Sequence, residues 1–451
     1  MTIAINPPRT YDRVAKFVEQ LRSQQIKQVR FEFADMHGVS RSKLVPIDAV
    51  EGFARKGLNF YGGMMGLDTA STVVQETGLH QDINYRDGLL MPDFDTVASL
   101  PWLPGVARVI CDFQWSETEP VPHAPRQVLK RVLQRAAEMG FDVMIGQELE
   151  FYLLDPATRQ PVFQGVHAFN TLRNQCLPII DELLEHLIAA GIDLIDHGCE
   201  YGPGQLEINY GPAIGLAAVD KTFTFKQAVK EICQRSGYLA TFMSRPFSDQ
   251  TGCGCHVHIC LIDRQTGQNI FLNLDDPDGL SITIKSFIQG ILDHGAGMMP
   301  LIAPTPNCYR RYLPPTFVSI YRGWGIQDRT AMVRVKACKD ENTRIEMRAA
   351  SSISNPYLSA AATIAAGLMG IQQQLPLQAP IEGRGLDQGH AYPRLPETLD
   401  EALAGLAGDR AMVEWLGEEF VRVFTAVKRS ELSRFKAHVS DWEKDEYMEV
   451  Y

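Results

Sequence analysis

The stretch Gly146-Gln147-Glu148-Leu149-Glu150-Phe151-Tyr152 places two carboxylates two residues apart inside an apolar segment. Apolar side chains alternate with them, as in a β-strand, so we expect Glu148 and Glu150 to point to the same face of a sheet. Like charges side by side repel each other, and they are tolerated where water solvates them or a cation bridges them. Taken alone, the stretch therefore fits either a solvated sheet face or a metal site.

Outward from this strand, further carboxylates and two histidines lie close to turns. Glu200 and Glu207 flank a Gly/Pro turn, His256 and His258 follow a Gly-rich turn with the same spacing of two, and Glu346 lies in a strand-like run. Taken alone, Glu200 and Glu207 fit surface positions better, and the histidine pair fits buried hydrogen bonds as well as it fits ligand or substrate contacts. Together, five glutamates and one or two imidazoles suit Mg²⁺ or Mn²⁺ rather than zinc.

Arginines gather between positions 310 and 348, although the whole chain carries a formal net charge of −11. Arginine binds carboxylate and phosphate groups through paired hydrogen bonds, whereas surface ion pairs would be the ordinary explanation. Neither a GxxxxGK[ST] nor a GxGxxG sequence is present, so arginines and divalent ions would have to hold nucleotide phosphates. Metal-binding carboxylates combined with phosphate-binding arginines indicate phosphoryl transfer. The seven arginines are Arg310, Arg311, Arg322, Arg329, Arg334, Arg344 and Arg348.

The chain length and a proline-rich segment predict two domains. A chain of 451 residues exceeds what one core usually fills, and a proline cluster at Pro120, Pro122 and Pro125 resembles a linker. We therefore divide the chain into residues 1–122 and 123–451. Strand-like runs separated by helical ones, including helices over 279–298 and 355–373, predict an α+β fold with a mainly antiparallel sheet in the large domain.

Composition limits the partners and the compartment. The acidic balance argues against nucleic acid or an anionic membrane as a partner. The N-terminus lacks the apolar core of a signal peptide, and no apolar run reaches the roughly 18–20 residues of a membrane span. Nine scattered cysteines without a CxxC pair favour a reduced, cytoplasmic protein.

Six ordered motifs resemble those of the glutamine synthetase superfamily. The stretch 146–152 is similar to GxExEFF, and the segment from Glu200 to Glu207 is similar to HExxxGQxE. Four later segments complete the resemblance: 252–258 resembles GSGMHxH, 307–311 resembles NSYKR, 328–334 resembles NR…R, and 344–357 resembles RIEVR…NPY. Because these motifs span nearly the whole chain, the chain is identified as a member of the superfamily, and its departures resemble the γ-glutamylamide synthetase branch.

The resemblance implies a fold, co-substrates and an assembly. It implies a small N-terminal β-grasp domain and a large catalytic domain with a curved antiparallel sheet flanked by helices. It implies an ATP-dependent ligase that joins L-glutamate to an amine through γ-glutamyl phosphate, with ATP and two or three Mg²⁺ or Mn²⁺ ions at each active site. It also implies a homododecamer of two stacked hexameric rings, with active sites between subunits.

The resemblance also implies roles for individual residues. One metal would be held by Glu150, Glu200 and Glu207, and a second by Glu148, His256 and Glu346. Arg334, Arg344 and His258 would contact ATP and its phosphates. Glutamate would be bound by Gly252, His256, Arg311 and Arg348, and the catalytic residues would be Arg329, Arg311 and Glu150.

Two positions depart from the family where ammonium is handled. By register, Phe317 takes the place of an acid on a flap, and Tyr61 takes the place of an aspartate that a neighbouring subunit supplies. An ammonium ion that leaves water for a site without a carboxylate is strongly disfavoured. Tyr61, Met64, Met65 and Phe317 would instead form an apolar slot, which predicts a hydrophobic or aromatic amine of the aniline or alkylamine type.

Several alternatives stay open. A shift in flap register would leave an ordinary glutamine synthetase that uses ammonia. A polyamine substrate would need other acids, for which Asp68 and Glu76 are candidates, and ethanolamine is a further alternative substrate. An inactive, regulatory member of the superfamily is the non-enzyme alternative, which the presence of all six metal-ligand positions disfavours.

Overall fold

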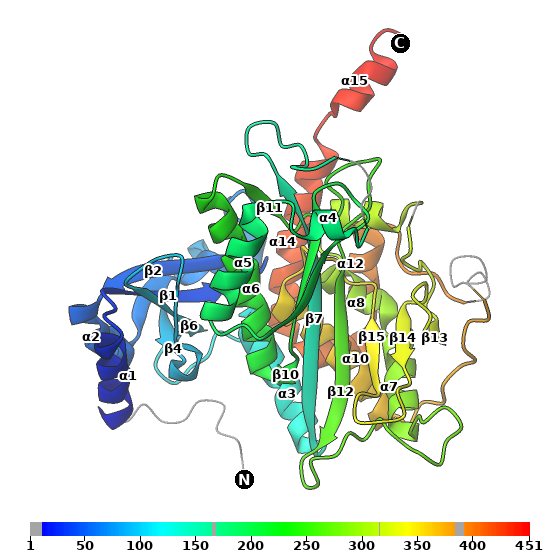
Figure 1. Ribbon diagram of the computed structural model, residues 1–451, viewed down its shortest axis with the longest axis horizontal. Helices are drawn as coiled ribbons and strands as arrows, with labels where there is room; N and C mark the ends of the chain where they lie inside the picture. Colours follow the sequence, from blue (N-terminus) through cyan, green and yellow to red (C-terminus); the bar gives the residue numbers. More distant parts are fainter. Residues whose placement is uncertain (1–10, 165–167, 315, 384–391) are drawn as a thin grey trace.

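The computed structural model describes residues 11–164, 168–314, 316–383 and 392–451. Two β-sheets lie next to each other, the N-terminal one in blue and a larger one built from β7 onward (Figure 1). Within the described residues, no helix is long and apolar enough to cross a membrane.

The N-terminal sheet has the strand order β2-β1-β6-β4-β3, with β5 paired to β6. Its β1–β6 pair is parallel and its other pairs are antiparallel. Strand and helix bounds are β1 Gln28–Ala34, β2 Ser40–Pro46, β3 Leu58–Tyr61, β4 Asp87–Pro92, β5 Ala98–Ser99, β6 Val106–Gln114, α1 Tyr11–Ser23 and α2 Ile47–Lys56. Short 3₁₀ helices at Gly62–Gly66, Gln75–Thr77, Gln81–Ile83 and Phe94–Thr96 connect them.

The larger sheet has the order β13-β14-β15-β12-β7-β9-β8, and β10 and β11 also pair with β7. Its pairs are antiparallel except β13–β14. The strands are β7 Phe141–Leu154, β8 Leu194–Cys199, β9 Gln205–Tyr210, β10 Ala213–Ile214, β11 Leu239–Thr241, β12 Cys255–Asp263, β13 Trp324–Ile326, β14 Val333–Lys336 and β15 Arg344–Met347. The predicted α+β class with a mainly antiparallel catalytic sheet is thus confirmed.

Helices flank this sheet, and α10 is buried along almost its whole length. The side chain of Gln147, on the face of β7 that the carboxylates leave free, donates to the Pro356 carbonyl at the start of α10 (3.4 Å). The helices are α3 Pro125–Glu138, α4 Thr171–Asn174, α5 Pro178–Ala189, α6 Leu216–Arg235, α7 Ile282–Asp293, α8 Gly295–Ile302, α9 Pro306–Tyr309, α10 Pro356–Gln372, α12 Leu399–Gly408, α13 Arg410–Leu416, α14 Glu418–Lys436 and α15 Asp441–Tyr447. The other face of the sheet is left for polar side chains.

Candidate active site

The two carboxylates of the 146–152 stretch lie on one face of β7. The side chains of Leu149 and Phe151 are buried, whereas Glu148 and Glu150 are half-buried on the opposite face. Pairing carries this face across the sheet, because Glu150 lies opposite Glu207 on β9. On the other side of β7, Glu148 lies opposite a histidine of β12. Directly opposed residues share a face, so the row is continuous.

The row extends over three further strands. His256 is the β12 partner of Glu148, and His258, two residues on, lies opposite Glu346 on β15. Glu346 in turn lies opposite Arg334 on β14. The i, i+2 spacing of the two histidines keeps both on the face that carries the carboxylates. Five neighbouring strands, from β9 to β14, therefore contribute polar side chains to one surface.

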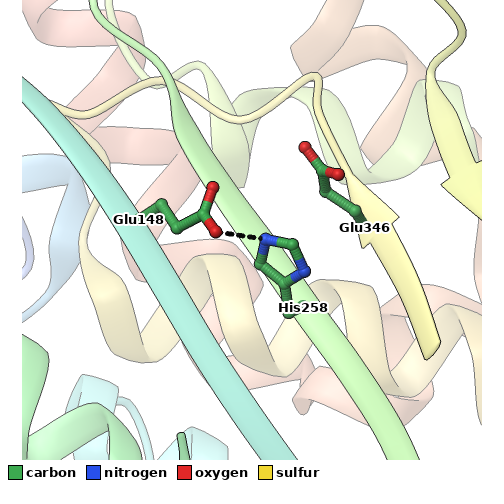
Figure 2. A group of neighbouring side chains, drawn as sticks. All are labelled: Glu148, His258 and Glu346. Carbon is green, nitrogen blue, oxygen red and sulfur yellow. Dashed lines mark ion pairs between the residues drawn. The ribbon is translucent and has the colours of Figure 1, made fainter. Parts of the chain in front are cut away.

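Two groups of potential ligand atoms form on this surface. In the first, which Figure 2 shows, the imidazole of His258 lies between the carboxyl groups of Glu148 and Glu346. His258 Nε2 is 2.9 Å from Glu148 Oε1. In the second group Glu148, Glu207 and His256 each offer an atom within 4.8 Å of the others. His256 Nδ1 is 3.4 Å from Glu148 Oε2 and 3.8 Å from Glu346 Oε1.

This grouping differs in detail from the expected ligand sets. Glu148 takes part in both groups, and His258, which we expected beside the nucleotide, joins the first. Glu150 lies next to the groups, with Oε2 accepting hydrogen bonds from Gln205 Nε2 and from the Gly254 backbone, both at 3.0 Å. Glu200 follows the end of β8 and interacts electrostatically with Glu150.

The carboxylates fall into two electrostatic classes. Burial, and next the charge of Glu150, raises the pKa of Glu200 to about 7. Burial, and next the charges of Glu150 and Glu148, raises the pKa of Glu207 to about 9. Crowded like charges on the β8–β9 side therefore favour the protonated form.

On the β12–β15 side, by contrast, the pKa values of the carboxylates are lowered. Burial alone would raise the pKa of Glu346, but the nearby charges of His256 and His258 lower it to about 2. The pKa of Glu148 is also held below its usual range, since hydrogen bonds from the same two histidines outweigh burial. Interactions with the two imidazoles thus favour the ionised form of the carboxylates on this side.

The donor set fits hard divalent cations. Carboxylate oxygens with few imidazole nitrogens match the preference of Mg²⁺ and Mn²⁺. A cation bound next to Glu150, Glu200 and Glu207 would offset the repulsion that raises the pKa of two of them.

Arginines border the same surface. Glu346 forms ion pairs with Arg348 and with Arg334, the latter at 3.0 Å. Arg344 Nε donates to His258 Nδ1 at 3.3 Å. Arg329 is exposed, and its carbonyl accepts a hydrogen bond from Arg348 Nε at 2.9 Å. Four of the predicted arginines therefore lie beside the carboxylate row.

Arg311 is buried and already held by the backbone. Its guanidinium donates to the carbonyls of Ala349 (3.3 Å) and Ala350 (3.2 Å). Gly252 and Gly254 pack directly against it: a Cβ at Gly252 would lie 2.7 Å from Arg311 Cγ, and one at Gly254 would lie 2.4 Å from Nη2. Only glycine fits this close approach, which places the predicted Gly252 backbone beside Arg311.

The predicted amine-slot residues occupy two separate environments. Phe317 is 56% exposed, with its ring centroid 5.8 Å from that of Tyr201. The Tyr61 hydroxyl lies 2.6 Å from His80 Nδ1 in the N-terminal domain, and Met64 is half-buried nearby along the chain. Met65 is completely buried in the core, because the 3₁₀ turn Gly62–Gly66 directs its side chain inward.

The acids considered for a polyamine differ in availability. Asp68 is buried, and its carboxylate accepts hydrogen bonds from the Ala70 and Thr72 backbones and pairs with Arg434 at 3.3 Å. Its own loop and Arg434 of α14 therefore already satisfy the carboxylate. Glu76 is exposed on the 3₁₀ helix Gln75–Thr77.

Some residues of this surface were not predicted from the sequence. Gln205 holds both Glu150 Oε2 and, at 3.2 Å, the Gly252 carbonyl. Tyr201 lies next to Glu200 in the chain, which could have marked it as a site residue. Phe169 contacts Tyr201 with a centroid distance of 6.4 Å, and nothing in its local sequence indicates this.

Comparison with known proteins places the chain and its fold in one family. The glutamine synthetase catalytic-domain model matches residues 122–447. Type-1 glutamine synthetase 2 of Dictyostelium discoideum is 33% identical over 450 residues, covering 96% of this chain and 86% of that protein. Glutamine synthetase of Halobacterium salinarum is 32% identical over 455 residues, covering 98% and 97%. The solved GmaS/ADP complex superposes with a TM-score of 0.86 at 31% identity, covering 96% of this chain and 99% of that one. The chain belongs to the glutamine synthetase family of ATP-dependent ligases.

Proposed function

We propose that this protein joins the γ-carboxylate of L-glutamate to a substituted, hydrophobic or aromatic amine, using ATP. The observation that carries the ligase part is the row of carboxylates and imidazoles on one face of the catalytic sheet, bordered by arginines. Such a surface can position and neutralise phosphate groups without covalent participation of the protein.

The reaction proceeds in two steps. A γ-carboxylate oxygen of glutamate attacks the γ-phosphorus of ATP, which gives γ-glutamyl phosphate and ADP. The amine nitrogen then attacks the acyl carbon, the carbon–oxygen bond to phosphate breaks, and the nitrogen loses a proton. The products are the γ-glutamylamide, ADP and phosphate.

Different arginines bind different anionic groups of the substrates. Arg334 and Arg344, with His258, bind the ATP phosphates, and Arg329 stabilises the phosphoryl group in transfer. Arg311 and Arg348 orient the carboxylates of glutamate. Arg311 is fixed by backbone carbonyls before substrate arrives, so little side-chain entropy is lost on binding.

The carboxylate row would hold two or three Mg²⁺ or Mn²⁺ ions. Glu150, Glu200 and Glu207 would hold one ion, and Glu148, His256 and Glu346 would hold another. Bound there, the ions would supply positive charge to neutralise the phosphates. Gln205 and the Gly254 backbone keep Glu150 oriented toward this surface.

The amine class rests on the departures at Phe317 and Tyr61. Neither side chain offers a carboxylate to hold ammonium or accept its proton, so an amine that is already neutral, or whose apolar group is buried on binding, is favoured. The likeness to GmaS, a γ-glutamylmethylamide synthetase, supports a substituted amine. Because Asp68 is occupied by its own loop and by Arg434, a dicationic polyamine is less well accommodated.

The proposal includes a homododecamer with shared active sites. Members of this family typically form oligomers. Tyr61 and Phe317 make separate sets of ring contacts within one chain, with His80 and Tyr201 respectively. A neighbouring subunit would bring the Tyr61 region of one chain to the Phe317 region of the next.

An amine panel tests this function. ADP release with glutamate and Mg²⁺ or Mn²⁺ is measured with ammonium, methylamine, isopropylamine, ethanolamine, putrescine and aniline, for the wild type and for Phe317→Glu. We expect hydrophobic amines to give the highest kcat/KM in the wild type. In Phe317→Glu we expect the ratio of ammonium to hydrophobic-amine turnover to rise by about tenfold, since a paired charge is gained. An unchanged ratio would remove Phe317 from the amine site.

A further inference from the structure

Three exposed aromatic side chains from distant segments gather into one cluster. Phe169, Tyr201 and Phe317 are 61%, 42% and 56% exposed. The Phe169 and Tyr201 rings are 6.4 Å apart and nearly perpendicular at 78°, and the Tyr201 and Phe317 rings are 5.8 Å apart at 40°. Large apolar side chains that stay exposed together commonly mark a binding site.

Phe169 lies on the face of the sheet that carries the carboxylates. A Cβ built on Gly198 of β8 would lie 3.8 Å from Phe169 Cδ1, so the phenyl ring covers the position where this strand has no side chain. Gly198 lies opposite Glu207, which lies opposite Glu150. Because opposed residues share a face, the Phe169 ring lies at the β8 end of the carboxylate row.

Tyr201 connects the cluster to Glu200. The two residues are adjacent, at the start of the turn that follows β8. The Tyr201 ring stands between those of Phe169 and Phe317. A molecule that contacts this ring is therefore within reach of the carboxylate-bearing turn.

The backbone at Phe169 is held in an unfavourable conformation. Its φ of 54° lies in the left-handed region, which bulky residues seldom adopt. The Phe169 N–H donates to the Cys199 carbonyl at 2.9 Å, and Asn170 caps α4 by accepting from the Leu172 N–H. Such strain persists only where the surroundings fix it, so the exposed ring has a defined position.

We propose that Phe169, Tyr201 and Phe317 form an aromatic clamp that receives the ring of an aryl or aralkyl primary amine. The inference rests on the proposed function and narrows its amine class. An aromatic substrate ring can meet the three rings edge-on or in offset stacking, which an aliphatic chain cannot do. It would bury ring surface that water now covers while its amino group points along the carboxylate row.

Paired amines test the clamp. The probes are benzylamine and methylamine, which share a primary amino group on a CH₂ or CH₃ carbon. The variants are Phe169→Ala, Tyr201→Ala and the ring-conserving Tyr201→Phe. The control is Leu172→Ala, whose side chain is 81% exposed in the neighbouring helix α4. Initial rates give kcat and KM for each amine, and sedimentation gives the oligomeric state.

We expect the wild type to prefer benzylamine. Each alanine variant should raise the KM for benzylamine about tenfold and change kcat/KM for methylamine less than about twofold, while Tyr201→Phe and Leu172→Ala behave as wild type. An equal loss with both amines, or a loss that follows dissociation of the oligomer, would overturn the clamp. If the wild type turns over methylamine but not benzylamine, the clamp is also overturned, but the proposed function still stands. If neither amine nor ammonium supports ADP release, the proposed function itself fails.

Discussion

Glu207 is a side chain whose burial opposes folding in the absence of a cation. Burial and three neighbouring carboxylates raise its pKa to about 9, so near neutral pH the folded protein keeps a proton that the unfolded chain releases. Asn209 Nδ2 donates to Glu207 Oε1 at 2.9 Å but does not offset this effect. A position that is unfavourable for a free carboxylate suits a metal ligand.

Substitution of this residue separates its role in stability from its role in metal binding. Below about pH 4.5 the carboxyl is protonated in both states and contributes nothing; as pH rises toward about 9 the wild type loses free energy of unfolding. In a metal chelator, Glu207→Gln should therefore have a Tm above that of the wild type, by a margin that grows from pH 5 to pH 8. It should lose at least about tenfold in Mn²⁺ affinity and in activity.

Thermal scans with and without Mn²⁺ measure both effects. Glu138→Gln, at the exposed C-terminal end of α3, is the matched control and should change neither. A lower Tm of Glu207→Gln in chelator together with a full Mn²⁺-dependent shift would show that Glu207 is structural.

For single residues, sequence spacing predicts well which side chains share a face within one strand. The i, i+2 pattern indicated that Glu148 and Glu150 share a face, and the burial of Leu149 and Phe151 agrees. It could not reveal that His258 lies 2.9 Å from Glu148, because that distance depends on strand pairing. The burial of Met65 could not be read from the sequence either, because a 3₁₀ turn has no apolar period by which to assign its side chains.

At the level of elements, glycines bring α7 and α10 into contact. A Cβ at Gly290 of α7 would lie 2.2 Å from the Ala366 carbonyl oxygen, and one at Gly370 of α10 would lie 2.1 Å from the Ser286 carbonyl oxygen. Helix α10 supports the face of β7 opposite the carboxylates through Gln147. The helix pair therefore forms the packed base on which the site strand rests.

A single methyl group added at the contact between α7 and α10 should disrupt their packing. Gly290→Ala should lower the free energy of unfolding by about 2–3 kcal/mol, because backbone atoms and not a flexible side chain must move. Gly52→Ala, in the middle of α2 where nothing lies within 4 Å of the added Cβ, should be neutral or stabilise by about 0.5–1 kcal/mol. Urea titration of both variants checks the contrast, and equal values would contradict the packing account.

Helical periodicity predicted most of these elements but not all of their ends. A single helix over 279–298 was wrong: α7 ends at Asp293 and α8 starts at Gly295. At the junction His294 Nδ1 lies 2.7 Å from Asp409 Oδ2, a partner more than one hundred residues away. A tertiary contact of this kind breaks a continuous apolar pattern without leaving a local signal.

At the scale of the whole molecule, a buried ion network joins the N-terminal sheet to helices α3, α6 and α10. Arg126 at the start of α3 donates to Asp112 of β6 at 2.7 Å, to Asp93 at 2.7 Å and to Asp220 of α6 at 2.8 Å. The Tyr357 hydroxyl of α10 donates to the same Asp220. One guanidinium thus connects the N-terminal strands with two helices of the catalytic domain.

Removal of the Arg126 guanidinium should lower the free energy of unfolding of the whole protein. Arg126→Leu leaves buried carboxylates without their partner and should cost about 3–5 kcal/mol of unfolding free energy. Arg22→Leu removes an exposed ion pair with Asp48 and should cost no more than about 1 kcal/mol. Denaturation followed by both fluorescence and circular dichroism measures the difference; a similar small effect in both variants would show that the network does not join the domains energetically.

The global architecture could be predicted only in outline. Alternating strand and helix signals indicated the α+β class, and the observed sheet order agrees with its mainly antiparallel character. The order β13-β14-β15-β12-β7-β9-β8 pairs strands more than one hundred residues apart, such as β7 and β12, which local patterns do not encode. For the same reason the aromatic clamp, drawn from three such distant segments, became visible only in the folded chain.

The central claim, ATP-dependent amide formation between glutamate and a hydrophobic amine, is tested most directly by product mass in a competition. The protein is incubated with ATP, Mg²⁺, glutamate and equal concentrations of ammonium and benzylamine at pH 7.5, and the γ-glutamyl products are quantified. The account predicts that γ-glutamylbenzylamide exceeds glutamine by at least about tenfold, with one ADP formed for each amide. Glutamine as the main product, or ADP without any amide, would contradict it.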